Sequence, residues 1–164
     1  MERGEHAVFA YGSNLDVGDL ARWLKARGWG ELRPTAVDVA VLRDWQLVWN
    51  YRSDVRRGGA ANVTRAPGEE VHGAVLTVND ALLEALDAKE GHPGRYRRER
   101  VSVDVLGEDG GPRPAWLYVV TPPYLSEARI PPTAAYLAVV VRGARALGLP
   151  MGYVRGLMNT ETRD

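Results

Sequence analysis

Cysteine is absent from the 164 residues of the chain, and its absence excludes several kinds of chemistry. Without a thiol, the protein cannot form a disulfide, an iron–sulfur cluster, a Cys-containing zinc site or a cysteine nucleophile. An excess of one charge is also missing, because 21 Lys and Arg balance 21 Asp and Glu. Proteins dedicated to nucleic acids or anionic membranes normally carry a basic excess. The composition therefore argues against both kinds of partner.

Long hydrophobic runs are missing as well. The longest apolar stretches, such as residues 134–141, fall far short of the roughly 20 residues that a membrane-spanning helix needs. The first residues, MERGEHAVFAYG, lack the charged start and apolar core of a signal peptide. We therefore expect a cytoplasmic protein. The length and the 45% hydrophobic content predict one domain over residues 1–164 with a sizeable core.

Lysine is nearly absent too. Lys25 and Lys89 are the only lysines, and all the other residues among the 21 Lys and Arg are arginine. We attribute this bias to genome composition.

The spacing of apolar residues predicts an α+β fold. Strand patterns occupy residues 6–11, 35–42, 45–51, 60–65, 71–78, 95–106 and 115–120. Helical spacing follows Asp16 and Asn79, which are suitable N-caps, and returns at residues 133–147 and 150–158. Residues 43–44 and 66–69 are interpreted as hairpin turns. Because most strands are joined by hairpins, we expect an antiparallel or mixed sheet that can curl into a small β-barrel with packed helices.

A first candidate site lies at residues 11–15, between a predicted strand and a predicted helix. Gly12 permits a tight turn, after which backbone N–H groups can point into one concavity and bind an anion. The plainer interpretation is an ordinary turn capped by Ser13 or Asn14. Ser13 is a poor candidate for a hydrolase nucleophile, because the Gly-x-Ser-x-Gly pattern is not met.

A second candidate lies at residues 87–91, at the end of the predicted middle helix. Glu90 would face the negative end of the helix dipole, which disfavours a charged carboxylate. A residue that must both take and give a proton near neutral pH needs such an environment. The alternative is a solvated surface residue. Asp87, one turn earlier, could equally be a structural carboxylate.

Other polar clusters carry weaker signals. Strand alternation places Arg95 and Arg97 on one face and Arg98 and Arg100 on the other, so a single phosphate-binding patch is not expected. The histidines show no metal-ligand spacing: His6, His72 and His92. We find no phosphate-loop or dinucleotide-binding pattern, and no metal is expected.

The two candidate segments together resemble one known family. FAYGSNL at residues 9–15 resembles the opening motif of the γ-glutamylcyclotransferase family, which includes AIG2-like proteins. LDAKEG at residues 86–91, followed by Tyr96, is similar to that family's catalytic segment. GGAANV at residues 58–63, VHGAV at 71–75 and the tail from Tyr136 to Tyr153 also resemble family stretches. The resemblance covers nearly the whole chain, in order.

This resemblance implies a fold, a reaction and a set of roles. The fold would be a small β-barrel with packed helices, and the reaction a cofactor-free cyclisation that releases 5-oxoproline from a γ-glutamyl compound. Glu90 would be the catalytic acid/base, while Tyr11, Gly12, Ser13, Asn14, Leu15 and Tyr136 would bind the substrate, with Tyr96 and Tyr118 in support. The partner would be a small γ-glutamyl molecule. Family members can be homodimers.

Three alternatives stay open within and beside this interpretation. Asn14-Leu15 after the Tyr-Gly-Ser motif favours substrates that are γ-glutamyl amino acids or γ-glutamyl amines over the glutathione-specific branch. An enzyme that trims γ-glutamyl groups in a biosynthetic pathway is a second alternative. A non-catalytic module that binds a small ligand on the same fold is the third.

Overall fold

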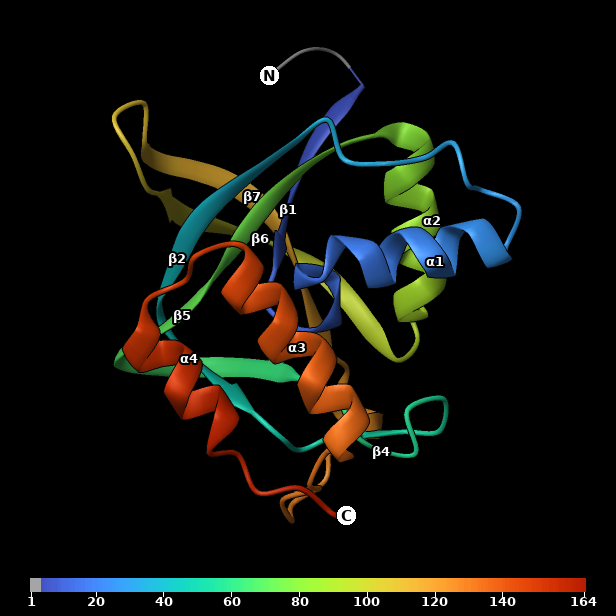
Figure 1. Ribbon diagram of the computed structural model, residues 1–164, viewed down its shortest axis with the longest axis vertical. Helices are drawn as coiled ribbons and strands as arrows, with labels where there is room; N and C mark the ends of the chain where they lie inside the picture. The colour runs from blue at the N-terminus through green and yellow to red at the C-terminus, as the bar shows by residue number, and fades with distance from the viewer. Residues whose placement is uncertain (1–3) are drawn as a thin grey trace.

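The protein is described by a computed structural model that covers residues 4–164. The strands are β1 (Glu5–Ala10), β2 (Ala36–Val48), β3 (Arg52–Ser53), β4 (Gly58–Gly59), β5 (Asn62–Asn79), β6 (Tyr96–Val105) and β7 (Gly111–Val120). The helices are α1 (Val17–Ala26), α2 (Asp80–Glu90), α3 (Ala134–Ala146) and α4 (Met151–Met158), with short 3-10 turns η1 (Ser13–Leu15) and η2 (Pro122–Tyr124). The α+β class expected from the sequence is confirmed (Figure 1).

Five strands form the barrel in the order β1-β5-β2-β6-β7. Neighbours in this order are antiparallel, and β1 meets β7 in parallel at Val8 and Trp116, which closes the sheet. Strand β1 is buried on both faces. Ala7 and Phe9 belong to the strand-lined core inside the barrel, while Val8 packs with the helices outside it. This double burial explains its nearly continuous apolar sequence.

The two predicted hairpin turns at residues 43–44 and 66–69 are wrong. Strands β2 and β5 each run through the expected turn and pair with one another on both sides of it. Their register changes between Arg43↔Glu70 and Trp45↔Arg65, which leaves residues 66–69 opposite Asp44. Asp44 has a φ of 67° and its carboxylate accepts a hydrogen bond from the Gly68 amide. Turn-forming residues therefore create a bulge within one long strand pair.

The four helices lie in the segments where the sequence predicts helices. Asp16 caps α1 by accepting from the Asp19 amide, and Asn79 caps α2 by accepting from the Leu82 amide. Helices α3 and α4 pack together, and α3 also packs against η1. None of the helices within residues 4–164 is long and apolar enough to cross a membrane.

Candidate active site

The turn after β1 is held close to two other parts of the chain. Added to Gly12, a Cβ atom would lie 3.2 Å from the Tyr136 hydroxyl and 3.2 Å from the Ala61 side chain. On the other side of the turn, Gly143 of α3 lies so close to the backbone of Leu15 and Asp16 that any side chain would collide with it. Because both contact points are glycines, α3 and the residue just before β5 can pack directly against the two sides of the turn.

Glu90 is the last residue of α2, and Gly91 ends the helix with a left-handed φ of 71°. The helix end brings Glu90 to η1, where the Asn14 side-chain amide donates a 3.0 Å hydrogen bond to Glu90 Oε1. The structure therefore unites the two candidate segments predicted from the sequence, although they lie about half the chain apart.

Lys89 completes this contact, and the sequence analysis gave it no role. Its amine donates to Asn14 Oδ1 and, at 3.4 Å, to Ser13 Oγ. Because a lysine can only donate, the Asn14 oxygen must face Lys89, and the Asn14 nitrogen then faces Glu90. Burial lowers the pKa of Lys89, with a further contribution from Arg56, although Glu90 opposes the shift. The available signal was that one of the only two lysines of the sequence, Lys89, directly precedes Glu90.

Four tyrosines form the floor of the site. The Tyr11 hydroxyl donates to the Tyr118 carbonyl at 2.6 Å, and the Tyr96 hydroxyl donates to the Ala61 carbonyl at 2.7 Å. The Tyr136 hydroxyl accepts from the Ala61 amide at 3.1 Å. Burial raises the pKa of Tyr136 to about 12 and also raises the pKa of Tyr11 and Tyr96. These hydroxyls therefore stay protonated and act as hydrogen-bonding groups.

Asp87 has the structural role that the sequence analysis left open. Tyr118 donates to Asp87 Oδ1 at 2.6 Å, and Arg98 binds both carboxylate oxygens at 2.8 and 3.1 Å. Burial opposes the ionisation of Asp87, but the hydrogen bonds from Arg98 and Tyr118 outweigh it and lower the pKa. Arg98 and Arg100 share a strand face, as predicted, and both lie over Trp116. Asp87 thus fixes α2 to the barrel.

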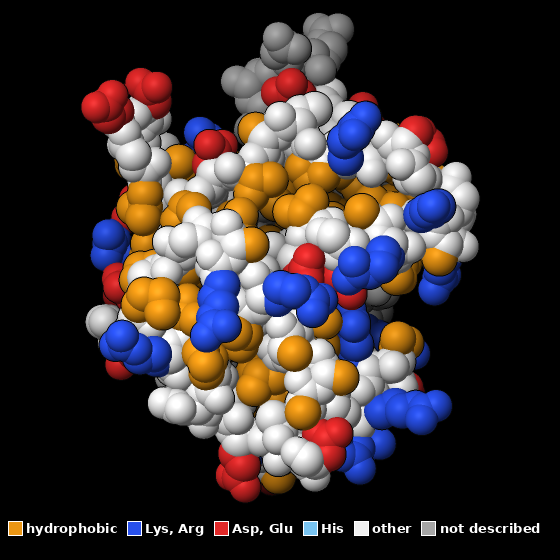
Figure 2. Space-filling model, viewed as in Figure 1, with side chains coloured by type: hydrophobic (Ala, Val, Ile, Leu, Met, Phe, Trp, Pro, Cys, Tyr) orange, Lys and Arg blue, Asp and Glu red, His pale blue; other side chains and the backbone are white. Residues whose placement is uncertain are grey.

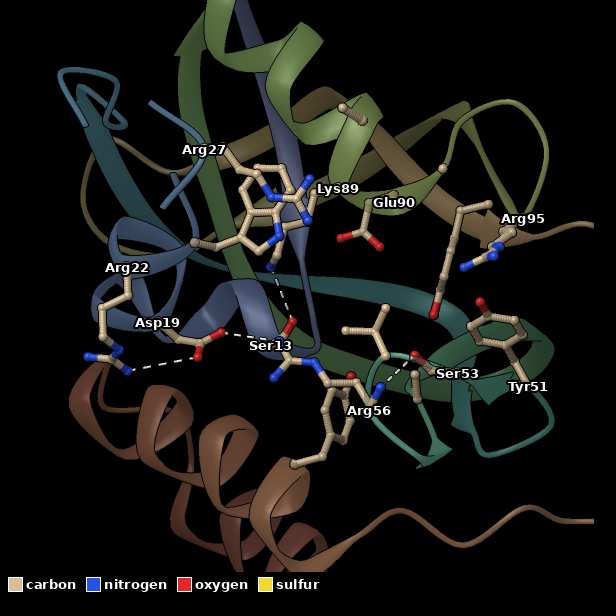
Figure 3. A pocket seen from close by; sticks show the side chains of 17 residues that line it. Ser13, Asp19, Arg22, Arg27, Tyr51, Ser53, Arg56, Lys89, Glu90 and Arg95 are labelled. Carbon is tan, nitrogen blue, oxygen red and sulfur yellow. Dashed lines mark hydrogen bonds and ion pairs between the residues drawn. The ribbon is translucent and has the colours of Figure 1, made fainter. Parts of the chain in front are cut away.

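Two connected spaces meet at Glu90. An inner recess of about 40 Å³ is lined by residues of the turn and by the tyrosines, and an outer cleft of about 620 Å³ opens beyond it. Four residues line both: Ser13, Glu90, Tyr96 and Tyr136. Figure 3 shows Glu90 at the end of α2, facing the space above Ser13.

The candidate binding residues divide between these spaces. Four of them line the inner recess and not the cleft: Tyr11, Gly12, Asn14 and Tyr118. Leu15 differs, because its side chain is buried in the core and lines neither space. The outer cleft adds residues that the sequence analysis did not select, among them Asp19, Arg56 and Tyr51.

The arrangement provides one carboxylate at the junction of a small polar recess and a wider cleft. Glu90 Oε1 is held by Asn14, whereas Oε2 has no hydrogen-bond partner among the described residues. Such a carboxylate can accept a proton and return it to a neighbouring atom. Within residues 4–164, no group of three His, Asp or Glu side chains is placed to hold a metal ion.

Comparison with known proteins places the chain in a family. The family described as "Gamma-glutamyl cyclotransferase, AIG2-like" matches residues 8–138. A γ-glutamylcyclotransferase of Bos taurus is 32% identical over 163 residues, or 95% of this chain and 79% of that protein, and the Homo sapiens protein of the same name is 31% identical over the same shares. A solved structure titled "Gamma-glutamyl cyclotransferase" superposes with a TM-score of 0.75 at 28% identity and covers 98% of this chain and 90% of that chain. The chain therefore belongs to the γ-glutamyl cyclotransferase, AIG2-like family.

Proposed function

We propose that the protein cyclises γ-glutamyl amino acids or γ-glutamyl amines to 5-oxoproline and releases the amino acid or amine. The observation that carries this proposal is the position of Glu90, at the junction of the recess and the cleft in a chain of this family. A recess of about 40 Å³ has room for one small polar group, and the cleft has room for a leaving group.

The reaction needs no protein nucleophile. The substrate's α-amine nitrogen attacks its own γ-carbonyl carbon, so that a C–N bond closes the five-membered ring. The bond between the γ-carbon and the leaving nitrogen then breaks. The proton lost by the α-amine is the proton that the leaving nitrogen requires, so the atoms balance without a co-reactant. Closure of a ring gains greatly from proximity once the glutamyl chain is held folded.

Glu90 is proposed to carry that proton. As general base it takes the proton from the attacking amine, and as general acid it delivers the proton to the leaving nitrogen. Its partner-free Oε2 is available for this transfer, while Asn14 holds Oε1. Lys89 is proposed as a positioning residue, because it fixes the orientation of the Asn14 amide.

The inner recess is proposed to hold one polar end of the glutamyl group. The Leu15 and Asp16 amides are used within the turn, where they bond to Gly12 and Ser13. We therefore assign the amides of residues 12–14 to the α-carboxylate or to the oxygen that becomes negative during attack. Tyr136 would complete the recess from α3, and Leu15 would act by anchoring the turn in the core. Tyr11, Tyr96 and Tyr118 would support its floor.

The competing interpretations predict different outcomes. A hydrolase based on Ser13 would have no histidine base, because His6, His72 and His92 line neither space. A non-catalytic module would bind γ-glutamyl compounds without releasing 5-oxoproline. The trimming enzyme differs only in its leaving group and requires a panel of substrates.

The decisive experiment measures 5-oxoproline by mass spectrometry after incubation with γ-glutamyl amino acids, γ-glutamyl-ε-lysine and glutathione. Glu90→Gln should lower kcat by roughly 100- to 10,000-fold, the usual contribution of a general acid/base, while leaving the thermal unfolding midpoint nearly unchanged. Glu84→Gln is the matched control, since Glu84 is an exposed residue on the same helix that lines neither space. Ordinary turnover by Glu90→Gln would remove the mechanism.

Three further expectations are part of this proposal. Residues 1–164 are proposed to work as a single domain, in the cytoplasm, and as a homodimer. Light scattering after size-exclusion chromatography tests the homodimer, and cell fractionation tests the location.

A further inference from the structure

The outer cleft has a basic excess that the chain as a whole lacks. Its cationic lining side chains are Arg22, Arg27, Arg56, Lys89 and Arg95, whereas its carboxylates are Asp19 and Glu90. The whole chain has zero formal charge. Figure 3 shows these cationic side chains distributed around the cleft, with Glu90 between Arg27 and Arg95 in this view.

Some of these cations already have partners in the protein. Arg56 is bound to Asp19 at 3.3 Å, and Arg22 lies 3.8 Å from the same carboxylate. The Lys89 amine is directed to Asn14 and Ser13. The Asp19 carboxylate is thus the partner of both Arg22 and Arg56, and Lys89 is bound to the turn at residues 11–15.

Arg27 and Arg95 differ from the other cations. Arg27 lies over the Trp23 ring at 4.9 Å, and Arg95 lines the cleft beside Tyr51. No ion pair within residues 4–164 includes either arginine. Two guanidinium groups without a carboxylate partner therefore border the space next to the proposed catalytic residue.

The glutamyl half of a substrate does not account for this excess. Its α-amine and α-carboxylate cancel in charge, and the proposed function already gives the amides of residues 12–14 to the α-carboxylate or the γ-carbonyl oxygen. The leaving group instead extends past Glu90 into the outer cleft. Its charge is therefore the one that meets Arg27 and Arg95.

We infer that the preferred leaving group is a dicarboxylic amino acid, or a short peptide with two carboxylates, and that Arg27 and Arg95 select it. This inference rests on the proposed function and names the substrate class within it. A guanidinium presents paired donors that match a carboxylate. The cleft volume of about 620 Å³ accommodates a leaving group with a charged side chain.

The test compares two substrates of nearly equal shape, γ-glutamylglutamate and γ-glutamylglutamine, whose leaving groups carry two carboxylates and one. γ-Glutamylalaninamide, whose leaving group has no carboxylate, is the neutral reference. At low ionic strength, kcat/KM should rise by about 2- to 5-fold for each carboxylate, the range of an exposed ion pair. The preference should shrink in about 1 M salt, where the Debye length is ~3 Å.

The double variant Arg27→Gln/Arg95→Gln should bring the glutamate-to-glutamine ratio close to unity. The change should come mainly from KM, because the two arginines are proposed to contact the leaving group and not the groups that react. Arg65→Gln is the matched control: Arg65 is also exposed and lies over a tryptophan, Trp45, at 4.8 Å, but it does not line the cleft. This control should keep the wild-type ratio.

Each outcome bears on one of the two proposals. A wild-type ratio near unity, or one that favours glutamine, overturns the inference and leaves the proposed function intact if 5-oxoproline forms. A glutamate preference that survives in the double variant overturns the assignment to Arg27 and Arg95. No 5-oxoproline from any substrate overturns both proposals.

Discussion

The inner recess and the outer cleft of the site are built in opposite ways. The recess is formed by buried side chains whose hydroxyl groups already bind backbone or carboxylate oxygens, as Tyr11 and Tyr96 do. The cleft is bordered by exposed arginines such as Arg22 and Arg27. Changes to the buried tyrosines of the recess should therefore alter stability and turnover together, whereas changes to the exposed arginines of the cleft should alter selectivity alone.

The difference reflects the cost of placing each kind of group. A buried hydroxyl must have a hydrogen-bond partner, and each of the four tyrosine hydroxyls of the recess has one. An exposed guanidinium remains hydrated, so it costs little free energy to leave it without a carboxylate partner. Rigid polar groups suit a reaction that requires one folded substrate geometry, and hydrated charges suit selection between leaving groups of different charge.

Lys89 lies at the boundary of the two regions and should give the largest effect after Glu90 itself. Lys89→Met removes the donor that orients Asn14, so we expect kcat/KM to fall by roughly 10- to 100-fold, the range for a hydrogen bond to a charged group. The free energy of unfolding should not decrease, because a buried amine is costly. Lys25→Met changes the only other lysine, which is exposed on α1, and should have no effect on either quantity.

The pH profile gives a second measure of Lys89. Because burial lowers its pKa from 10.5, the amine loses its proton at a lower pH than an ordinary lysine. Activity that depends on the charged amine should therefore decline on the alkaline side below that value. Lys89→Arg keeps the charge across this range, so its decline should move to higher pH. An unchanged alkaline limb in this variant would rule out the positioning role.

A substitution at Gly143 tests whether the recess depends on the packing of α3 against the turn at residues 11–15. Gly143→Ala places a methyl group against the Leu15 backbone, so α3 or the turn must move. We expect a loss of about 2–3 kcal/mol in urea unfolding, typical of overpacking, together with lower kcat. Gly156→Ala is the control, since nothing lies within 4 Å of a Cβ at this exposed position in α4. That change should stabilise the protein by about 0.5–1 kcal/mol. Equal effects of the two variants on stability and kcat would show that the close packing of α3 against the turn has no role in the site.

The sequence predicted the recess better than the cleft. The turn at residues 11–15 and the end of α2 each carry local signals, because a glycine turn and an N-capped helix are determined by neighbouring residues. The arginines of the cleft come from α1 and the residue after it, from the segment after β3 and from the segment after α2. Only the folded chain brings these segments together, so their shared cleft left no pattern in the sequence.

Long-range pairing also explains the fold features that the sequence did not predict. Asp44 and Gly68 are turn-forming residues, and locally each indicates the end of a strand. Pairing between β2 and β5 continues on both sides of them, so the favourable local turn becomes a bulge. The caps of α1 and α2 were predictable, because a cap depends on residues three positions apart.

Asp87 supports the recess from outside and should give the smallest effect. Asp87→Asn keeps the side-chain shape but removes the charge that binds Arg98, so we expect the unfolding free energy to fall by about 1 kcal/mol at neutral pH.

The folded pKa of Asp87 lies below its ordinary value, because Arg98 and Tyr118 outweigh the effect of burial. Its stabilising contribution is therefore complete above the ordinary aspartate pKa of about 3.9 and is lost as the pH falls through the lower folded value. The difference in unfolding free energy between wild type and Asp87→Asn should accordingly be largest near pH 7 and should disappear in acid. Asp109→Asn, in the exposed turn between β6 and β7, should leave that free energy unchanged. A gap that persists in acid would mean that the charge of Asp87 does not account for its contribution to stability.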